Sequence, residues 1–187
     1  MEKINKFLDY GKKAINIYES QLAKDIINAI PDSDNTARKQ YKGEKHSLLI
    51  LKNNKMGVAN YLGPGTNIIK RLEDNDPPRS YVDRVAKLHD INYSLSTYEP
   101  NKLKQLKDIR DADALMINQL KNKNLDNKIN IAIGEKFIKS KIALEDVGVL
   151  NKDQFAGKLN MYSKKDKELF LTEKKRLLDS QPRANNH

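Results

Sequence analysis

Hydrophobic residues recur at intervals of three and four along most of the chain, which is the period of an amphipathic helix. In residues 3–29 they include Ile4, Leu8 and Leu22 on one broad side, and Pro31 ends the pattern. The same period predicts further helices over residues 66–72, 78–98, 101–123, 129–144 and 164–178. We therefore expect a mostly α-helical fold with helical arms at both ends.

The breaks in this pattern predict the remaining elements. Residues 47–51, in which four apolar residues follow Ser47, are too few for an independent helix, so a short strand or extended segment is expected there. Gly63-Pro64-Gly65 must lie in a loop, after which Thr66 is the expected cap of a short helix. Pro78 suits the first turn of the next helix, and residues 99–101 break it. We divide the chain into an amphipathic arm (1–43), a core (44–125) and a basic helical extension (126–187).

Composition limits the classes of protein and of site. The 187 residues are 38% hydrophobic and 32% charged, which supports one modest core with polar arms. The absence of cysteine excludes disulfides and thiolate metal sites, leaving histidine and oxygen ligands, so any metal should be a hard ion. No segment has the apolar length of a signal peptide or a membrane span.

The net charge of +10 is unevenly distributed. Residues 61–100 sum to −1, whereas the segments on both sides are positive. A nucleic-acid-binding protein usually concentrates basic residues on its functional element. The pattern here indicates a cation site with a basic rim, and that rim either favours anionic lipid surfaces or only increases solubility.

His89 is the histidine with a chemically distinctive setting. His46 and His187 have no partner near them in the sequence. His89 has apolar neighbours at helical spacing, including Val85 and Tyr93, and so should face the protein interior. A buried imidazole needs hydrogen-bond partners, which are either a main-chain carbonyl in a purely structural role or a second side chain.

The next helix offers such a side chain in Asp113. Its neighbours at helical spacing include Ile109 and Met116, whereas those of the nearby Asp111 include Lys107. Periodicity therefore predicts that Asp113 is buried and that Asp111 faces water. Burial of an ionised carboxylate is costly unless it is paired.

A short connection brings these helices together. Residues 99–101 leave little chain between them, so the two helices should pack antiparallel. That packing would bring His89 against Asp113, with the hydroxyl of Tyr93 nearby. Asp90 points about 100° further round its helix, toward the glycine loop. Carbonyl oxygens of a glycine loop together with one carboxylate are suitable ligands for calcium.

Two motifs resemble a known family. Tyr61-Leu62-Gly63-Pro64-Gly65 followed by His89-Asp90-Ile91-Asn92-Tyr93 is similar to the calcium loop and His-Asp-x-x-Tyr motif of phospholipase A2. The residues in and around these motifs are most similar to the cysteine-free phospholipase A2-like domain of parvovirus capsid proteins and related viral or virus-like elements. The similarity covers roughly residues 44–120. The arms have no counterpart in it.

This resemblance implies the role of each residue in an active site. The carbonyl oxygens of Tyr61, Gly63 and Gly65 and the carboxylate of Asp90 would bind Ca²⁺. His89 would be the general base, Asp113 would orient it, and Tyr93 would brace Asp113. Asp111 is the fallback for Asp113, although the helical-face argument disfavours it.

The resemblance also implies a function, namely calcium-dependent hydrolysis of the sn-2 ester of glycerophospholipids. The protein would belong to a virion, beside capsid proteins of the same particle, and would act on a host endosomal membrane. One alternative is a non-enzymatic basic capsid or nucleic-acid-packaging protein with an inert core, although nucleic acid is the less favoured partner. Another is a membrane-disrupting protein that acts through residues 3–29.

Overall fold

The computed structural model describes residues 41–42, 44, 49–52, 55–63, 65–122, 125–126, 128–151 and 161–180. The predicted helix over residues 3–29 lies outside these residues. The described elements follow the chain in the order β1 (Leu49–Lys52), β2 (Lys55–Val58), α3 (Ile68–Glu73), α4 (Tyr81–Ser96), α5 (Lys102–Leu120), α6 (Lys128–Asp146) and α7 (Lys164–Asp179). The predicted mostly α-helical fold is confirmed.

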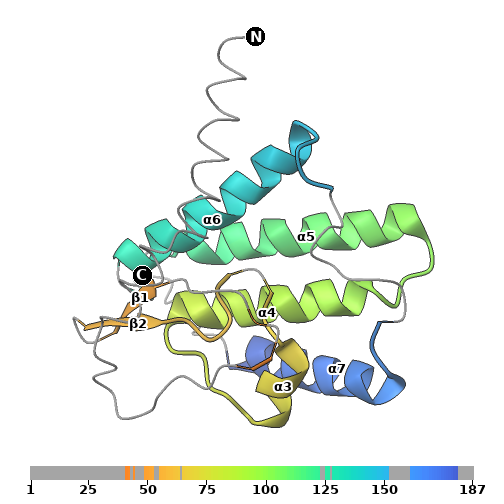
Figure 1. The fold of residues 1–187 in the computed structure, drawn as a ribbon, viewed down its shortest axis with the longest axis horizontal. Helices are drawn as coiled ribbons and strands as arrows, with labels where there is room; N and C mark the ends of the chain where they lie inside the picture. The colour runs from red at the N-terminus through yellow and green to blue at the C-terminus, as the bar shows by residue number, and fades with distance from the viewer. Residues whose placement is uncertain are drawn as a thin grey trace.

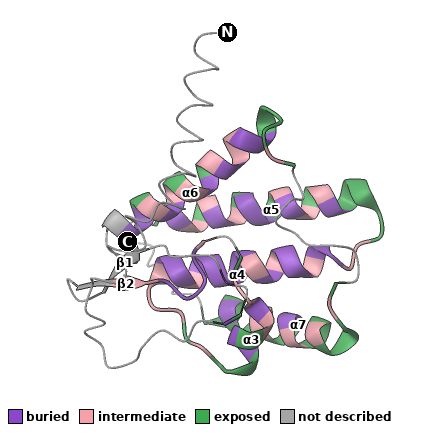
Figure 2. Ribbon diagram, viewed as in Figure 1, coloured by how far each residue is buried: buried purple, intermediate pink, exposed green. Residues whose placement is uncertain are grey.

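Helix α4 occupies the centre of the fold. Helices α5 and α7 lie along opposite sides of α4, and α6 crosses next to α5 (Figure 1). Most residues of α4 are buried, including Val82, Val85, Leu88 and Ile91, as Figure 2 shows by colour. A helix that is covered on several sides can present different side chains to several neighbouring elements at once.

The helix boundaries differ from the sequence prediction at α4. Ser80 is the N-cap: its backbone is extended, and its side chain accepts a hydrogen bond from the N–H of Asp83. The helix therefore begins at Tyr81 and not at Pro78, because a polar cap that satisfies a free N–H decides the start. In α5 the side chain of Asn101 caps the helix in the same way.

The extended segment predicted at residues 47–51 is present in part as β1. It pairs with β2 as an antiparallel hairpin in which Leu49 lies opposite Val58. Residues 47 and 48 lie outside the described residues. The chain leaves β2 directly into the glycine loop, so the hairpin sets the starting point of that loop.

Helices α6 and α7 share the core of the central helices. Ile138 of α6 and Phe170 and Leu177 of α7 belong to the same hydrophobic cluster as Val82 of α4. The sequence reasoning treated residues 126–187 as an extension, and that boundary stays a prediction. Within the described part of the chain, no helix combines the length and apolar character needed to cross a bilayer.

Gly134 allows α6 to pack closely against α4 and α5. A Cβ atom at this position would lie 2.8 Å from Cγ1 of Val82 and 3.3 Å from Cδ1 of Leu120. A β-branched valine has little rotameric freedom with which to move away. The glycine that weakens the helical pattern in the sequence is therefore needed for packing.

We expect Gly134→Ala to lower the free energy of unfolding, by about 1–3 kcal/mol through overpacking. At an unconstrained helix position the same change would raise it by about 0.5–1 kcal/mol. Urea unfolding measures the difference. Adding Val82→Ala removes the methyl group that clashes, so the double variant should lose less stability than the two single losses combined. A stabilising Gly134→Ala would show that α6 does not approach α4 closely.

Candidate active site

The imidazole of His89 and the carboxylate of Asp113 form a buried pair between α4 and α5. Nε2 of His89 lies 2.9 Å from Oδ1 of Asp113, and the two residues are 8% and 1% exposed. The predicted burial of Asp113 is confirmed. Asp111 faces water and pairs with Lys107 at 2.5 Å, because two residues on a helix differ by about 200° in direction.

Tyr93 adds a second donor to the same carboxylate oxygen. Its hydroxyl donates to Oδ1 of Asp113 at 2.5 Å. Its ring lies against the imidazole of His89, with 4.2 Å between the ring centroids. Tyr93 follows His89 by four residues, one helical turn, so α4 alone places both groups on Asp113.

The surroundings of the pair favour the charged form of each group, a carboxylate at Asp113 and an imidazolium at His89. Burial alone would raise the pKa of Asp113, but the hydrogen bond and charge of His89, followed by Lys141 and Tyr93, lower it below its usual value. Burial alone would lower the pKa of His89, but hydrogen bonds with Asp113 and Asp90 raise it above its usual value. The carboxylate is thus held ionised and ready to stabilise a protonated imidazole.

A second buried carboxylate, Asp83, fixes the start of the glycine loop. It is fully buried and accepts hydrogen bonds from the backbone N–H groups of Asn60 at 3.0 Å, Tyr61 at 2.7 Å and Leu62 at 2.9 Å. Three successive amides therefore point at α4. Sequence reasoning missed this residue, although a Ser-x-x-Asp pattern from Ser80 marks it as part of a helix start.

The glycine loop gathers main-chain oxygens. Gly63 and Gly65 have φ values of 129° and 81°, which residues with a Cβ rarely adopt. The hydroxyl of Thr66 lies 3.2 Å from the carbonyl oxygen of Tyr61 and 3.4 Å from that of Gly63, so the two oxygens converge. Pro64 lies outside the described residues.

Thr66 does not cap the following helix, contrary to the prediction. The side chain of Asn67 accepts the hydrogen bond from the N–H of Lys70 and is the N-cap of α3. Because the hydroxyl of Thr66 faces the carbonyl oxygens of the loop, the next polar residue, Asn67, caps the helix.

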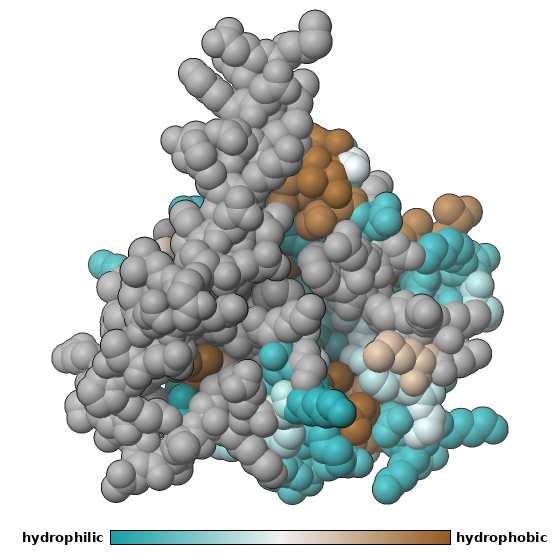
Figure 3. All heavy atoms as spheres, viewed as in Figure 1, coloured by the Kyte–Doolittle hydropathy of each residue, from teal (hydrophilic) through white to brown (hydrophobic). Residues whose placement is uncertain are grey.

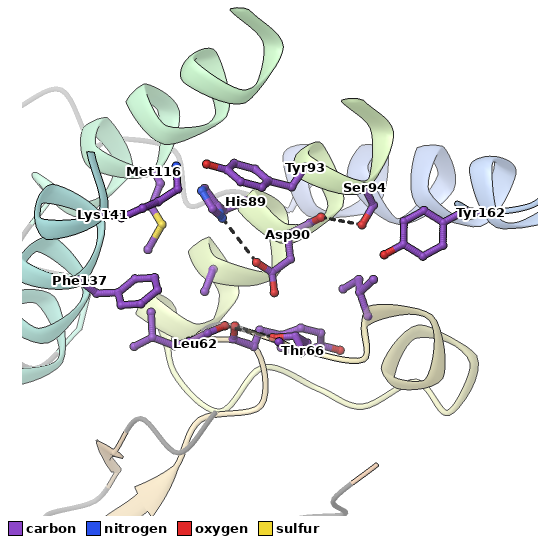
Figure 4. Close-up of a pocket in the computed structure, with 15 residues that line it drawn as sticks. Leu62, Thr66, His89, Asp90, Tyr93, Ser94, Met116, Phe137, Lys141 and Tyr162 are labelled. Atoms are coloured by element: carbon purple, nitrogen blue, oxygen red, sulfur yellow. Dashed lines mark hydrogen bonds and ion pairs between the residues drawn. The ribbon is translucent and has the colours of Figure 1, made fainter. Parts of the chain in front are cut away.

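Asp90 lies beside this loop and beside His89. Its Oδ1 is 3.5 Å from Nδ1 of His89 (Figure 4). Within the described part of the chain, its Oδ2 is buried without a hydrogen-bond partner. Burial raises the pKa of Asp90, and His89 offsets the rise in part. A buried carboxylate oxygen without a partner is suited to a cation ligand.

These oxygens fit a calcium ion. Neutral carbonyl oxygens and one carboxylate are ligands that a hard cation prefers. The described residues contain no cluster of three or more histidine, cysteine, aspartate or glutamate residues that would hold a metal by side chains. A site built mainly from main-chain oxygens, such as those of Tyr61 and Gly63, would not form such a cluster.

A cavity of about 110 Å³ lies between the loop and the helices. His89, Asp90, Gly63 and Gly65 line it, together with apolar side chains of Leu62, Ile68, Met116 and Phe137 (Figure 4). The structure thus brings the predicted His89, Asp90, Tyr93 and loop residues to one cavity, with Asp113 behind the imidazole. A polar end beside an apolar wall suits a substrate with a polar head and a hydrocarbon tail.

Three lining residues, Phe137, Lys141 and Tyr162, come from the part of the chain that the sequence analysis assigned to the C-terminal extension and not to the site. Lys141 reaches the cavity from α6, and Tyr162 reaches it from just before α7. The burial of Lys141 could have been predicted from the sequence, because it lies three residues from Ile138 and from Leu144 and thus on the apolar side of its helix. Tyr162 lies in a segment without a clear pattern.

Comparison with known proteins gives one family. Residues 52–141 match a family model described as "Phospholipase A2-like domain". This part of the chain is similar to phospholipase A2-like domains. No curated protein and no solved structure matches the chain. The matched residues include the glycine loop, all of α3, α4 and α5, and α6 as far as Lys141.

We expect Asp83→Asn to loosen the loop. An asparagine removes the charge and presents an NH₂ group to some of the amide donors, and each hydrogen bond to a charged group contributes about 1.5–3 kcal/mol. Hydrogen exchange at the amides of Asn60, Tyr61 and Leu62 should become faster. The exposed Asp111 supplies the control, since Asp111→Asn should change the free energy of unfolding by no more than about 0.5 kcal/mol. Unchanged exchange at all three amides would mean that another contact holds the loop.

Proposed function

We propose that the chain is a calcium-dependent phospholipase A2 that hydrolyses the sn-2 ester of glycerophospholipids. The observation that carries the proposal is the double environment of His89. Its Nε2 is hydrogen-bonded to Asp113, whereas its Nδ1 faces the cavity beside Asp90. The base atom, the oxygen-rich loop and the apolar wall therefore adjoin one small space.

The side chains support general-base hydrolysis. Nδ1 of neutral His89 takes a proton from a water molecule as the water oxygen bonds to the ester carbonyl carbon. Nε2–H remains bonded to Asp113, whose negative charge stabilises the imidazolium that forms. The imidazolium then gives its proton to the leaving alkoxide as the ester C–O bond breaks. The products are a fatty acid and a lysophospholipid.

The loop residues would hold the metal ion of this reaction. When bound by Asp90 and the carbonyl oxygens of Tyr61, Gly63 and Gly65, calcium would supply positive charge for the substrate phosphate and the developing oxyanion. The side chain of Asp83 keeps the loop backbone in position for that role, because its three amide contacts fix the adjoining peptide planes.

The proposed partner is a phospholipid surface. Exposed apolar side chains follow the end of α6, where Val147 and Val149 are 48% and 43% exposed. Figure 3 shows hydrophobic surface in this region, at the upper right beside the end of α6. The excess of basic residues outside residues 61–100 favours contact with anionic lipids.

We further propose that the protein is carried in a virus-like particle with capsid proteins and acts on a host endosomal membrane. The supporting observations are the similarity of the two motifs to the parvovirus-type domain and the absence of cysteine. Calcium-dependent leakage of endosome-like vesicles by purified particles, lost on mutation of His89, tests this role. Particles that lack the chain would be the control.

Fatty-acid release from labelled phosphatidylcholine vesicles tests the activity. We expect release with calcium, none with a chelator, and a loss of about 10²-fold or more for His89→Gln, since a positioned general base typically contributes that much. His46→Gln is the matched control, because His46 is not part of the proposed site. Chelator-resistant release, or full release by His89→Gln, would contradict the mechanism.

A pair of carboxylates two residues apart gives a second test. Asp113→Asn should lower turnover at least about tenfold, because the neutral amide cannot stabilise the imidazolium as a carboxylate does. Asp111→Asn should leave turnover within about twofold, since Asp111 is exposed and paired only with Lys107 among its described contacts. Turnover and calcium affinity are measured for both. A larger loss from Asp111→Asn would overturn the assignment.

A further inference from the structure

Lys141 extends from α6 to the far side of the His89–Asp113 pair. Its Nζ lies 2.8 Å from Oδ2 of Asp113 and donates to it. The side chain is 6% exposed, and its ammonium group lies 5.0 Å from the centroid of the Tyr93 ring. A buried ammonium group is costly unless it is closely paired, so this contact is specific and not incidental.

The two oxygens of Asp113 are divided between different partners. Oδ1 accepts from Nε2 of His89 and from the hydroxyl of Tyr93. Oδ2 accepts from Lys141, and a nitrogen of Arg110 lies further away at 3.8 Å. A carboxylate held at both oxygens cannot rotate about its Cβ–Cγ bond without losing a contact. Its orientation toward the imidazole is therefore fixed from behind.

Lys141 also separates two buried carboxylates. Its Nζ lies 2.7 Å from Oε1 of Glu145, one turn further along α6. Burial raises the pKa of Glu145, and the charge of Asp113 raises it further. Nη1 of Arg110 also faces both carboxylates, but it lies close only to Glu145, at 3.1 Å, and is 3.8 Å from Asp113. Without Lys141, Asp113 would lose its close cation, and one of two neighbouring buried carboxylates then tends to take up a proton. A protonated Asp113 would be a poor acceptor for the imidazole N–H.

We infer that Lys141 is a positioning residue of the hydrolytic site, which fixes the carboxylate of Asp113 so that His89 presents Nδ1 to the cavity. The inference rests on the proposed phospholipase function. It makes the site a chain of three helices, with the base on α4, the carboxylate on α5 and the lysine on α6. Lys141 touches neither the reacting water nor the ester, and it acts through Asp113.

The primary test compares Lys141→Met with Lys139→Met. Lys139 lies on the same helix but is 57% exposed and pairs with Glu135. For Lys141→Met we expect kcat for vesicle lipolysis to fall about tenfold or more, with KM and the calorimetric Kd for calcium unchanged within about twofold. Lys139→Met should match the wild type in all three. An unchanged kcat for Lys141→Met, or a parallel loss of calcium affinity, would overturn the inference.

Two further variants keep the test decisive if Lys141→Met folds poorly. Lys141→Arg retains the charge and should restore part of kcat. The double variant Lys141→Met, Glu145→Gln removes the charge of the carboxylate that would lose Lys141 and keep only Arg110, whose Nη1 lies 3.1 Å from Oε2 of Glu145, so its Tm should recover while its kcat stays low. Recovery of kcat together with Tm would show that Lys141 serves stability alone and would overturn the inference.

The outcome for the wild type separates this inference from the proposed function. Absence of calcium-dependent fatty-acid release by the wild type would contradict the phospholipase assignment itself. Release by the wild type with equal kcat in Lys141→Met would contradict the role of Lys141 and leave the assignment intact.

Discussion

The carboxylate of Asp83 is the contact on which the geometry of the site depends. It is fully buried, and the amides of residues 60–62 donate to it. His89 and Asp90 follow six and seven residues later on the same helix, about 9 Å along its axis. One helix therefore holds the loop near its start and presents the base and the acidic ligand further on. Any shift of the loop relative to His89 would require breaking charge-assisted hydrogen bonds.

Buried ion pairs repeat this principle on each side of α4. Lys87 pairs with Glu173 of α7 at 2.6 Å, Arg71 of α3 pairs with Glu44 at 2.7 Å, and Lys141 pairs with Asp113. Such pairs add little net stability, because desolvation offsets most of the attraction. Each pair is satisfied in few arrangements, however. We infer that these contacts select the orientation of helices around the cavity, while the apolar cluster supplies most of the stability.

Local periodicity was sufficient to predict part of the site. The inward direction of His89 and Asp113, and the outward direction of Asp111, follow from helical phase alone, which depends only on neighbouring residues. The start of α4 and the cap of α3 were predicted one to three residues early. At Ser80 and Asn67, competition between adjacent polar residues for free N–H groups decides the boundary, and tertiary contacts such as that of Thr66 influence it.

Contacts between distant segments could not be predicted in this way. Asp83 appears in the sequence as an ordinary acidic residue of a first helical turn. Its contacts with the loop depend on where β2 places the start of the loop relative to α4. Lys141 lies on an apolar face, which signals a buried lysine but not its partner. Gly134 weakens a helix locally and permits its packing globally, so its role appears only when α4 and α6 are seen together.

The cavity also requires residues beyond the phospholipase A2-like match. Tyr162 lines it and packs edge-on against Phe170 of α7, with 5.2 Å between the ring centroids. Phe170 is fully buried in the main cluster, so α7 fixes the wall that Tyr162 forms. The match ends at Lys141, the residue that reaches Asp113 from α6. The proposed hydrolytic site thus combines the matched segment, which reaches Phe137 and Lys141 on α6, with a wall from the α7 region outside the match, and all of these parts are held in one core.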